Sequence, residues 1–118
     1  MASGADITLA SLESARALVQ SGRIAEAERA YAALADSKAP PLEAFSFLAM
    51  RAFQARDIPR AVGLLERAVA QAPGDPRFLT DLGLAQRAKG DLPGAERSFA
   101  RAIASEPAYF LAHLYICG

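Results

Sequence analysis

DPRFLTDLGLAQRAKGDLPGAERSFARAIASEP, residues 75–107, contains the start and stop signals of two helices joined by a tight turn. Asp75 can cap a first helix with Pro76 in its first position, and an apolar periodicity then runs to Lys89. Gly90 can adopt the left-handed conformation that closes a helix, and Asp91 can cap the helix that follows. The stretch therefore predicts helices at about 76–89 and 92–104.

The same signals recur along the chain with a period of thirty-four residues. Asp57, Pro59 and Ala61 align with Asp91, Pro93 and Ala95, and further matches are Arg67 with Arg101, Ala68 with Ala102 and Pro73 with Pro107. The period predicts units at about 8–41, 42–75 and 76–109, with a fourth begun at 110–118. The remaining helices are expected at about 7–20, 24–36, 42–55, 58–71 and 108–117, and short connections make successive helices antiparallel.

Composition narrows the class of protein. The 118 residues are 53% hydrophobic and carry 13 basic and 13 acidic side chains, so the formal net charge is zero. Without a cluster of Lys or Arg, the chain lacks the electrostatic footprint of a nucleic-acid or anionic-membrane surface. No stretch alternates apolar and polar residues as a strand does, and none is long and apolar enough to span a membrane. We therefore expect one folded all-α domain over residues 1–118.

The units resemble the tetratricopeptide repeat, whose pattern is W-x2-L-G-x2-Y, then A-x3-F, then P. The third unit matches best, although it lacks the leading Trp and the Tyr; its matching residues are Leu79, Leu82, Gly83, Ala95, Phe99, Ala102 and Pro107. The small residues Ala49 and Gly83 fall where paired helices must touch. The resemblance covers residues 8–118 and implies antiparallel helix pairs stacked as a right-handed α-solenoid, with three units and the first helix of a fourth.

The resemblance also implies a non-enzymatic module that binds a protein or peptide partner on its concave side, which the first helix of each pair lines. The residues expected on that side form one stripe on each first helix: Leu12, Arg16, Val19, Ser46, Met50, Phe53, Thr80, Leu84 and Arg87. Glu43 and Arg77 are expected at the entrances to the stripe. The alternative is that these residues belong to the core of a strongly curved array or lie under a returning C-terminal segment.

One known ligand class of the family is not expected. Repeats that hold the acidic C-terminal tails of cytosolic chaperones use a clamp of Lys and Asn on groove positions of their first helices. This chain contains no Asn, and its corresponding positions carry Ser46, Met50, Thr80 and Leu84. The sequence therefore argues against a carboxylate clamp.

Residues that suggest chemistry are few. His113 and Cys117 are four residues apart on the last predicted helix, but no second Cys or His completes a metal site or activates the thiol. No Gly-rich phosphate loop or paired acidic metal motif occurs. We therefore expect no catalysis, no cofactor and no metal. The N-terminus lacks a secretion signal, which favours the cytoplasm, and the abundance of Ala with Arg over Lys suggests a bacterial source.

The final segment, residues 108–118, is nearly all apolar although terminal repeats normally carry a polar outer face. One interpretation is self-association as a homodimer through this helix, by Phe110, Leu111, Leu114, Tyr115 and Ile116. The other is that the chain is an N-terminal substrate-positioning or oligomerising arm of a longer, enzymatic protein.

Overall fold

The protein is all-α in the computed structural model, which describes the backbone of residues 4–108 and the side chains of residues 11–108. Six helices make up this part of the chain, without a strand: α1 (Gly4–Gln20), α2 (Ile24–Ala35), α3 (Leu42–Gln54), α4 (Ile58–Gln71), α5 (Pro76–Lys89) and α6 (Leu92–Ser105). The predicted helices are confirmed, and the largest difference is that α1 begins at Gly4 rather than near residue 7. The helix predicted at 108–117 lies outside the described residues.

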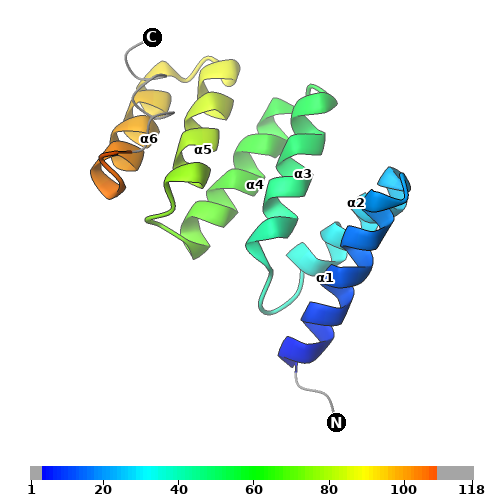
Figure 1. The fold of residues 1–118 in the computed structure, drawn as a ribbon. Helices are drawn as coiled ribbons and strands as arrows, with labels where there is room; N and C mark the ends of the chain where they lie inside the picture. The colour runs from blue at the N-terminus through cyan, green and yellow to red at the C-terminus, as the bar shows by residue number, and fades with distance from the viewer. Residues whose placement is uncertain (1–3, 109–118) are drawn as a thin grey trace. The chain divides into compact units, whose positions relative to one another are not determined.

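The helices belong to two compact units, residues 1–51 and 52–118, whose boundary lies within α3. In the first unit α1 packs on α2, and in the second α4 packs on α5 and α5 on α6 (Figure 1). Short connections join these neighbours, so each pair is antiparallel as expected. The expected single domain and its solenoid shape remain predictions.

Small residues allow the helices to approach closely. Ala15 and Ala27 are completely buried in the first unit, as are Ala61 and Ala68 in the second. Gly83 of α5 lies against the ring of Phe99 on α6, where a Cβ added to the glycine would lie 2.6 Å from the nearest ring atom. The predicted role of Gly83 at a helix contact is therefore confirmed.

Aspartates begin the last three helices as predicted. Their side chains accept hydrogen bonds from backbone N–H groups of the first turn: Asp57 from Arg60 (3.3 Å), Asp75 from Arg77 (3.0 Å) and Asp91 from Gly94 (3.0 Å). Each bond satisfies a donor that has no partner within its helix. A proline follows in the first turn of each of these helices.

Left-handed residues close three of the helices. They are Gly22, Arg56 and Gly90, with φ of 80°, 62° and 94°. At each turn this residue donates its N–H three residues back, and the next residue donates five residues back, as in Arg23 to Leu18, Asp57 to Ala52 and Asp91 to Gln86. The prediction for Gly90 is confirmed, while Arg56 adopts the same backbone without being glycine.

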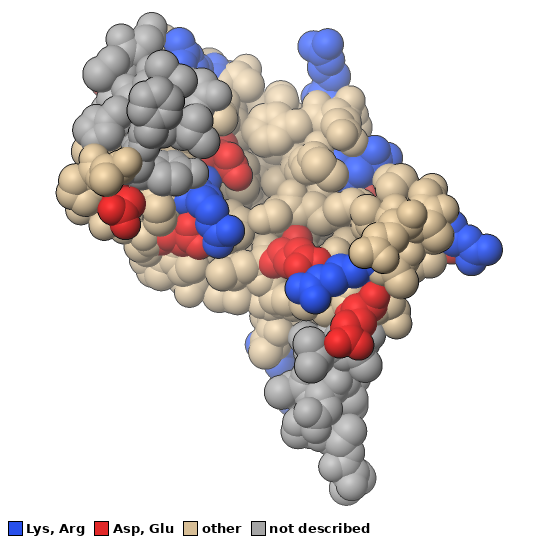
Figure 2. Space-filling view, in the orientation of Figure 1, with Lys and Arg blue, Asp and Glu red and all other residues tan. Residues whose placement is uncertain are grey.

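Within the described residues, no helix combines the length and the hydropathy needed to cross a bilayer. On the face shown in Figure 2, acidic and basic side chains are interspersed rather than gathered by sign.

Candidate functional site

The first unit contains a pocket of about 420 Å³ that opens to solvent. Helices α1 and α3 form its sides, and Tyr31 of α2 contributes to its wall. The residues that line it are Arg16, Val19, Gln20, Tyr31, Glu43, Ser46, Phe47 and Met50. All eight belong to residues 1–51, so the pocket is complete within one unit.

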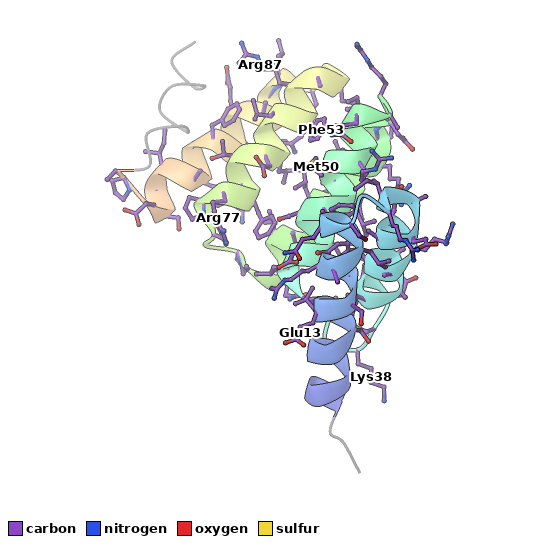
Figure 3. All side chains as sticks on the ribbon, turned by 45° about the vertical axis from the view of Figure 1, so that its right-hand side comes forward. Glu13, Lys38, Met50, Phe53, Arg77 and Arg87 are labelled. Atoms are coloured by element: carbon purple, nitrogen blue, oxygen red, sulfur yellow. The ribbon has the colours of Figure 1, made fainter. Side chains whose placement is uncertain are left out.

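Aromatic and aliphatic side chains form the apolar part of the pocket. The rings of Tyr31 and Phe47 stack with centroids 4.6 Å apart and an interplanar angle of 28°. Met50 is 46% exposed, one of two large apolar side chains so exposed in the described part of the chain, and Figure 3 shows it on α3. Methionine is flexible and polarisable and adapts to irregular partners, while a stacked ring pair is rigid. The pocket thus joins a fixed aromatic wall to an adaptable edge.

The polar part of the pocket is an ion pair between α1 and α3. The Arg16 Nε donates to both carboxylate oxygens of Glu43, at 3.0 and 2.9 Å, and its Nη2 donates to Oε1 at 2.6 Å. The Tyr31 hydroxyl donates to the Oε2 of Glu43 at 2.6 Å. Four hydrogen bonds therefore converge on one carboxylate, and they tie together all three helices of the unit.

These contacts shift the titration of all three groups. Hydrogen bonds from Arg16 hold the pKa of Glu43 below its ordinary value, and the same contact raises the pKa of Arg16. Burial, followed by the hydrogen bond to Glu43, raises the pKa of Tyr31 to about 12. At neutral pH the pocket therefore presents one positive charge, one negative charge and a neutral phenol.

The structure brings four of the predicted partner-binding residues to this pocket: Arg16, Val19, Ser46 and Met50. Two other predictions need correction, because Leu12 is 8% exposed and Thr80 is 2% exposed. Both face into the packed interior, where a partner cannot reach them.

The remaining predicted residues are not placed at this pocket. Phe53 and Leu84 are half-buried and Arg87 is exposed, and all three belong to the second unit. Whether a partner contacts them stays a prediction. Phe110, Leu111, Leu114, Tyr115 and Ile116, proposed for self-association, lie outside the described residues, as do His113 and Cys117.

Three residues that line the pocket are not among those predicted from the sequence: Gln20, Tyr31 and Phe47. Tyr31 aligns with a packing position of a second helix, and nothing in the sequence shows that its hydroxyl reaches α3. Glu43 is predicted at an entrance to the stripe, but the sequence does not indicate its pairing with Arg16.

In the described part of the chain, no three His, Cys, Asp or Glu side chains cluster so that they could hold a metal ion.

A family model described as tetratricopeptide repeat matches the sequence twice, at residues 12–76 and 47–110. No curated protein matches the sequence significantly. Solved structures do match, among them the first such repeat domain of Spaghetti (RPAP3) bound to the HSP90 peptide SRMEEVD. It is 21% identical, with a TM-score of 0.78 over 93% of this chain and 87% of that one.

Two bacterial structures are also similar. An O-GlcNAc transferase mutant from Thermobaculum terrenum is 27% identical, with a TM-score of 0.77 over 98% of this chain but 22% of that one. PcrH from Pseudomonas aeruginosa is 21% identical, with a TM-score of 0.75 over 97% of this chain and 89% of that one. A second PcrH structure contains the chaperone-binding region of PopB. At these identities the structural likenesses establish the fold.

Proposed function

The chain belongs to the tetratricopeptide repeat family, and from that premise we propose that it is a non-enzymatic module that binds a peptide or protein partner. The observation that carries the proposal is the pocket of the first unit, where a stacked Tyr31–Phe47 pair adjoins the exposed Met50. A pocket that is largely apolar with a few fixed polar groups is the usual form of a recognition site. The partner would insert an apolar side chain into it.

The structural neighbours support binding of this kind without identifying the ligand. PcrH is seen with a region of PopB, and RPAP3 with an acidic HSP90 peptide. In this chain the cation of the pocket, Arg16, is already paired with Glu43, and no Asn is present for a carboxylate clamp. We therefore propose an apolar anchor rather than an acidic tail. A bacterial, cytoplasmic setting is part of the proposal, and the abundance of Ala with Arg over Lys supports the bacterial source.

The proposal is tested by selecting peptides that bind the full chain from a displayed random library and measuring their affinity for two variants. Met50→Asp places a charge at the edge of the pocket and is expected to weaken binding at least about tenfold. Leu92→Asp is the matched control, since Leu92 is the other large apolar side chain that is strongly exposed in the described part of the chain, at 59%, and lies in the second unit. Equal losses in both variants would refute the assignment of the pocket.

A second candidate function is a repeat arm that positions a substrate for a longer enzyme or joins subunits. The observation in its favour is the Thermobaculum transferase, of which this chain matches 22%. Light scattering over a concentration series, on the chain and on Leu111→Asp, tests the oligomerising form. A dimer that Leu111→Asp converts to a monomer with unchanged peptide binding would favour this candidate.

A further inference from the structure

We propose that Glu43 is a specificity-determining residue, which occupies the Nε and Nη2 donors of Arg16 from within the chain and restricts the pocket to uncharged, apolar anchors. The inference rests on the proposed function, because it concerns which ligands the same pocket accepts. It goes beyond that function by assigning the discrimination to one side chain. The argument depends on hydrogen-bond geometry, burial and charge around that carboxylate.

The first step is that Glu43 takes the Nε and Nη2 donors of Arg16. Arg16 is the one cationic side chain among the residues that line the pocket, and Glu43 is the one anionic side chain. Three hydrogen bonds of 2.6 to 3.0 Å join them in a nearly bidentate arrangement. Arginine and carboxylate groups pair in this planar way because their geometries match. An incoming ligand carboxylate that approached the Nε–Nη2 edge of the guanidinium would meet Glu43 already bound there.

The second step is that Glu43 cannot move aside freely. Its Oε2 also accepts the hydrogen bond of the Tyr31 hydroxyl, and Tyr31 is only 2% exposed. The Tyr31 ring is held by its stack on Phe47. If Glu43 swung out, it would leave a largely buried hydroxyl without its acceptor, and such a group carries a desolvation penalty. Tyr31 therefore acts as a positioning residue for the carboxylate.

The third step concerns the charge that a ligand meets. With both groups ionised the pocket has no net charge, and an acidic side chain near Arg16 would also lie near Glu43. Two carboxylates that share one arginine lie close enough to repel each other even in a solvated site. The repulsion from Glu43 therefore offsets the attraction that an acidic ligand gains from Arg16. The other polar lining groups, Gln20 and Ser46, are uncharged. The surface that remains for binding is the apolar one.

The experiment uses the full chain labelled with ¹⁵N and two short blocked peptides. One presents a leucine between two glutamines, and the other presents it between two glutamates. Affinities come from amide and arginine Nε–H shifts during titration of wild type, Glu43→Gln and Glu26→Gln. Glu26→Gln is the matched control because it removes the same charge from the same unit, where Glu26 pairs with Arg23 at 3.5 Å and does not line the pocket.

Glutamine at position 43 can still accept from Tyr31 but leaves the charge of Arg16 uncompensated. Because the Arg16 and Glu43 side chains are 49% and 36% exposed, we expect Glu43→Gln to bind the glutamate peptide about three- to fivefold more tightly than wild type does. The affinity for the glutamine peptide should change by less than about twofold. Glu26→Gln should leave both affinities unchanged. If Glu43→Gln gains no affinity for the glutamate peptide, or if wild type binds both peptides equally, the inference is overturned.

A second variant gives an independent result if Glu43→Gln folds poorly. Arg16→Gln leaves Glu43 as the uncompensated charge, and it should bind the glutamate peptide more weakly than wild type does. The outcome for the proposed function is separate. If the glutamine peptide binds neither wild type nor any variant while Glu43→Gln gains affinity for the glutamate peptide, the apolar anchor is wrong but the role of Glu43 stands. If neither peptide binds wild type or any variant, both proposals fail.

Discussion

Replacing Gly83 by alanine should destabilise the second unit, although alanine is the better helix former. An alanine Cβ at this position would lie 2.6 Å from Cε1 of Phe99 and 2.8 Å from two more ring atoms. Phe99 is only 2% exposed, so its ring cannot move into solvent. Overpacking a core costs about 1–3 kcal/mol, and removing a glycine from a helix interior returns about 0.5–1 kcal/mol. With three ring contacts this short, the net loss should be about 1–2 kcal/mol.

Urea unfolding followed by circular dichroism measures this loss as a lower midpoint at unchanged slope. Gly63→Ala on α4 is the matched control, because nothing lies within 4 Å of a Cβ there, and it should raise stability by about 0.5–1 kcal/mol. In a Phe99→Leu background the cost of Gly83→Ala should largely disappear, since the clashing ring is gone. If Gly83→Ala were as stabilising as Gly63→Ala, the close contact between α5 and α6 would be refuted.

Three further outcomes are expected. Asp91→Ala should lower stability by about 1 kcal/mol in urea unfolding because the N–H of Gly94 loses its acceptor, and Asp91→Asn should retain most of it. Folding lowers the pKa of Glu43 from its ordinary 4.5. The ionised carboxylate therefore stabilises the folded state above about pH 4.5, and this stabilisation is lost as the pH falls through the lower pKa of the folded state. Unfolding curves of wild type and Glu43→Gln should therefore converge in acid, and a gap that stays constant with pH would contradict this. In alkaline absorbance titration, one of the three tyrosines should ionise near pH 12, and Glu43→Gln should lower that pKa because the carboxylate contributes to it.

Local features of the fold could be predicted from the sequence. Helix caps and left-handed turn residues depend on only a few adjacent residues, so a short sequence pattern is enough to predict them. Examples are the caps at Asp57, Asp75 and Asp91 and the left-handed Gly90. The thirty-four-residue period predicts the boundaries of the other helices, because the same local signals recur in each unit.

The candidate site could be predicted only in part. The helical stripe selects Arg16 and Met50, which do line the pocket, because both lie on regular helices. It is wrong for Thr80, which packing buries. The pair of Arg16 with Glu43 joins residues twenty-seven positions apart, and its existence depends on how α1 and α3 pack. Spacing along one helix carries no information about such a contact.

The three left-handed turn residues bear on how repeated units diverge from one another. Gly22, Arg56 and Gly90 follow at thirty-four-residue intervals and share one hydrogen-bond pattern, yet the middle one lacks the residue type that the backbone favours. An arginine at φ of 62° carries a conformational cost of about 1 kcal/mol, which Arg56→Gly would remove. Backbone geometry can thus persist in a copy whose residue signature differs. Degenerate units of such chains are therefore better recognised by aligning backbone dihedral angles than by aligning amino-acid sequences.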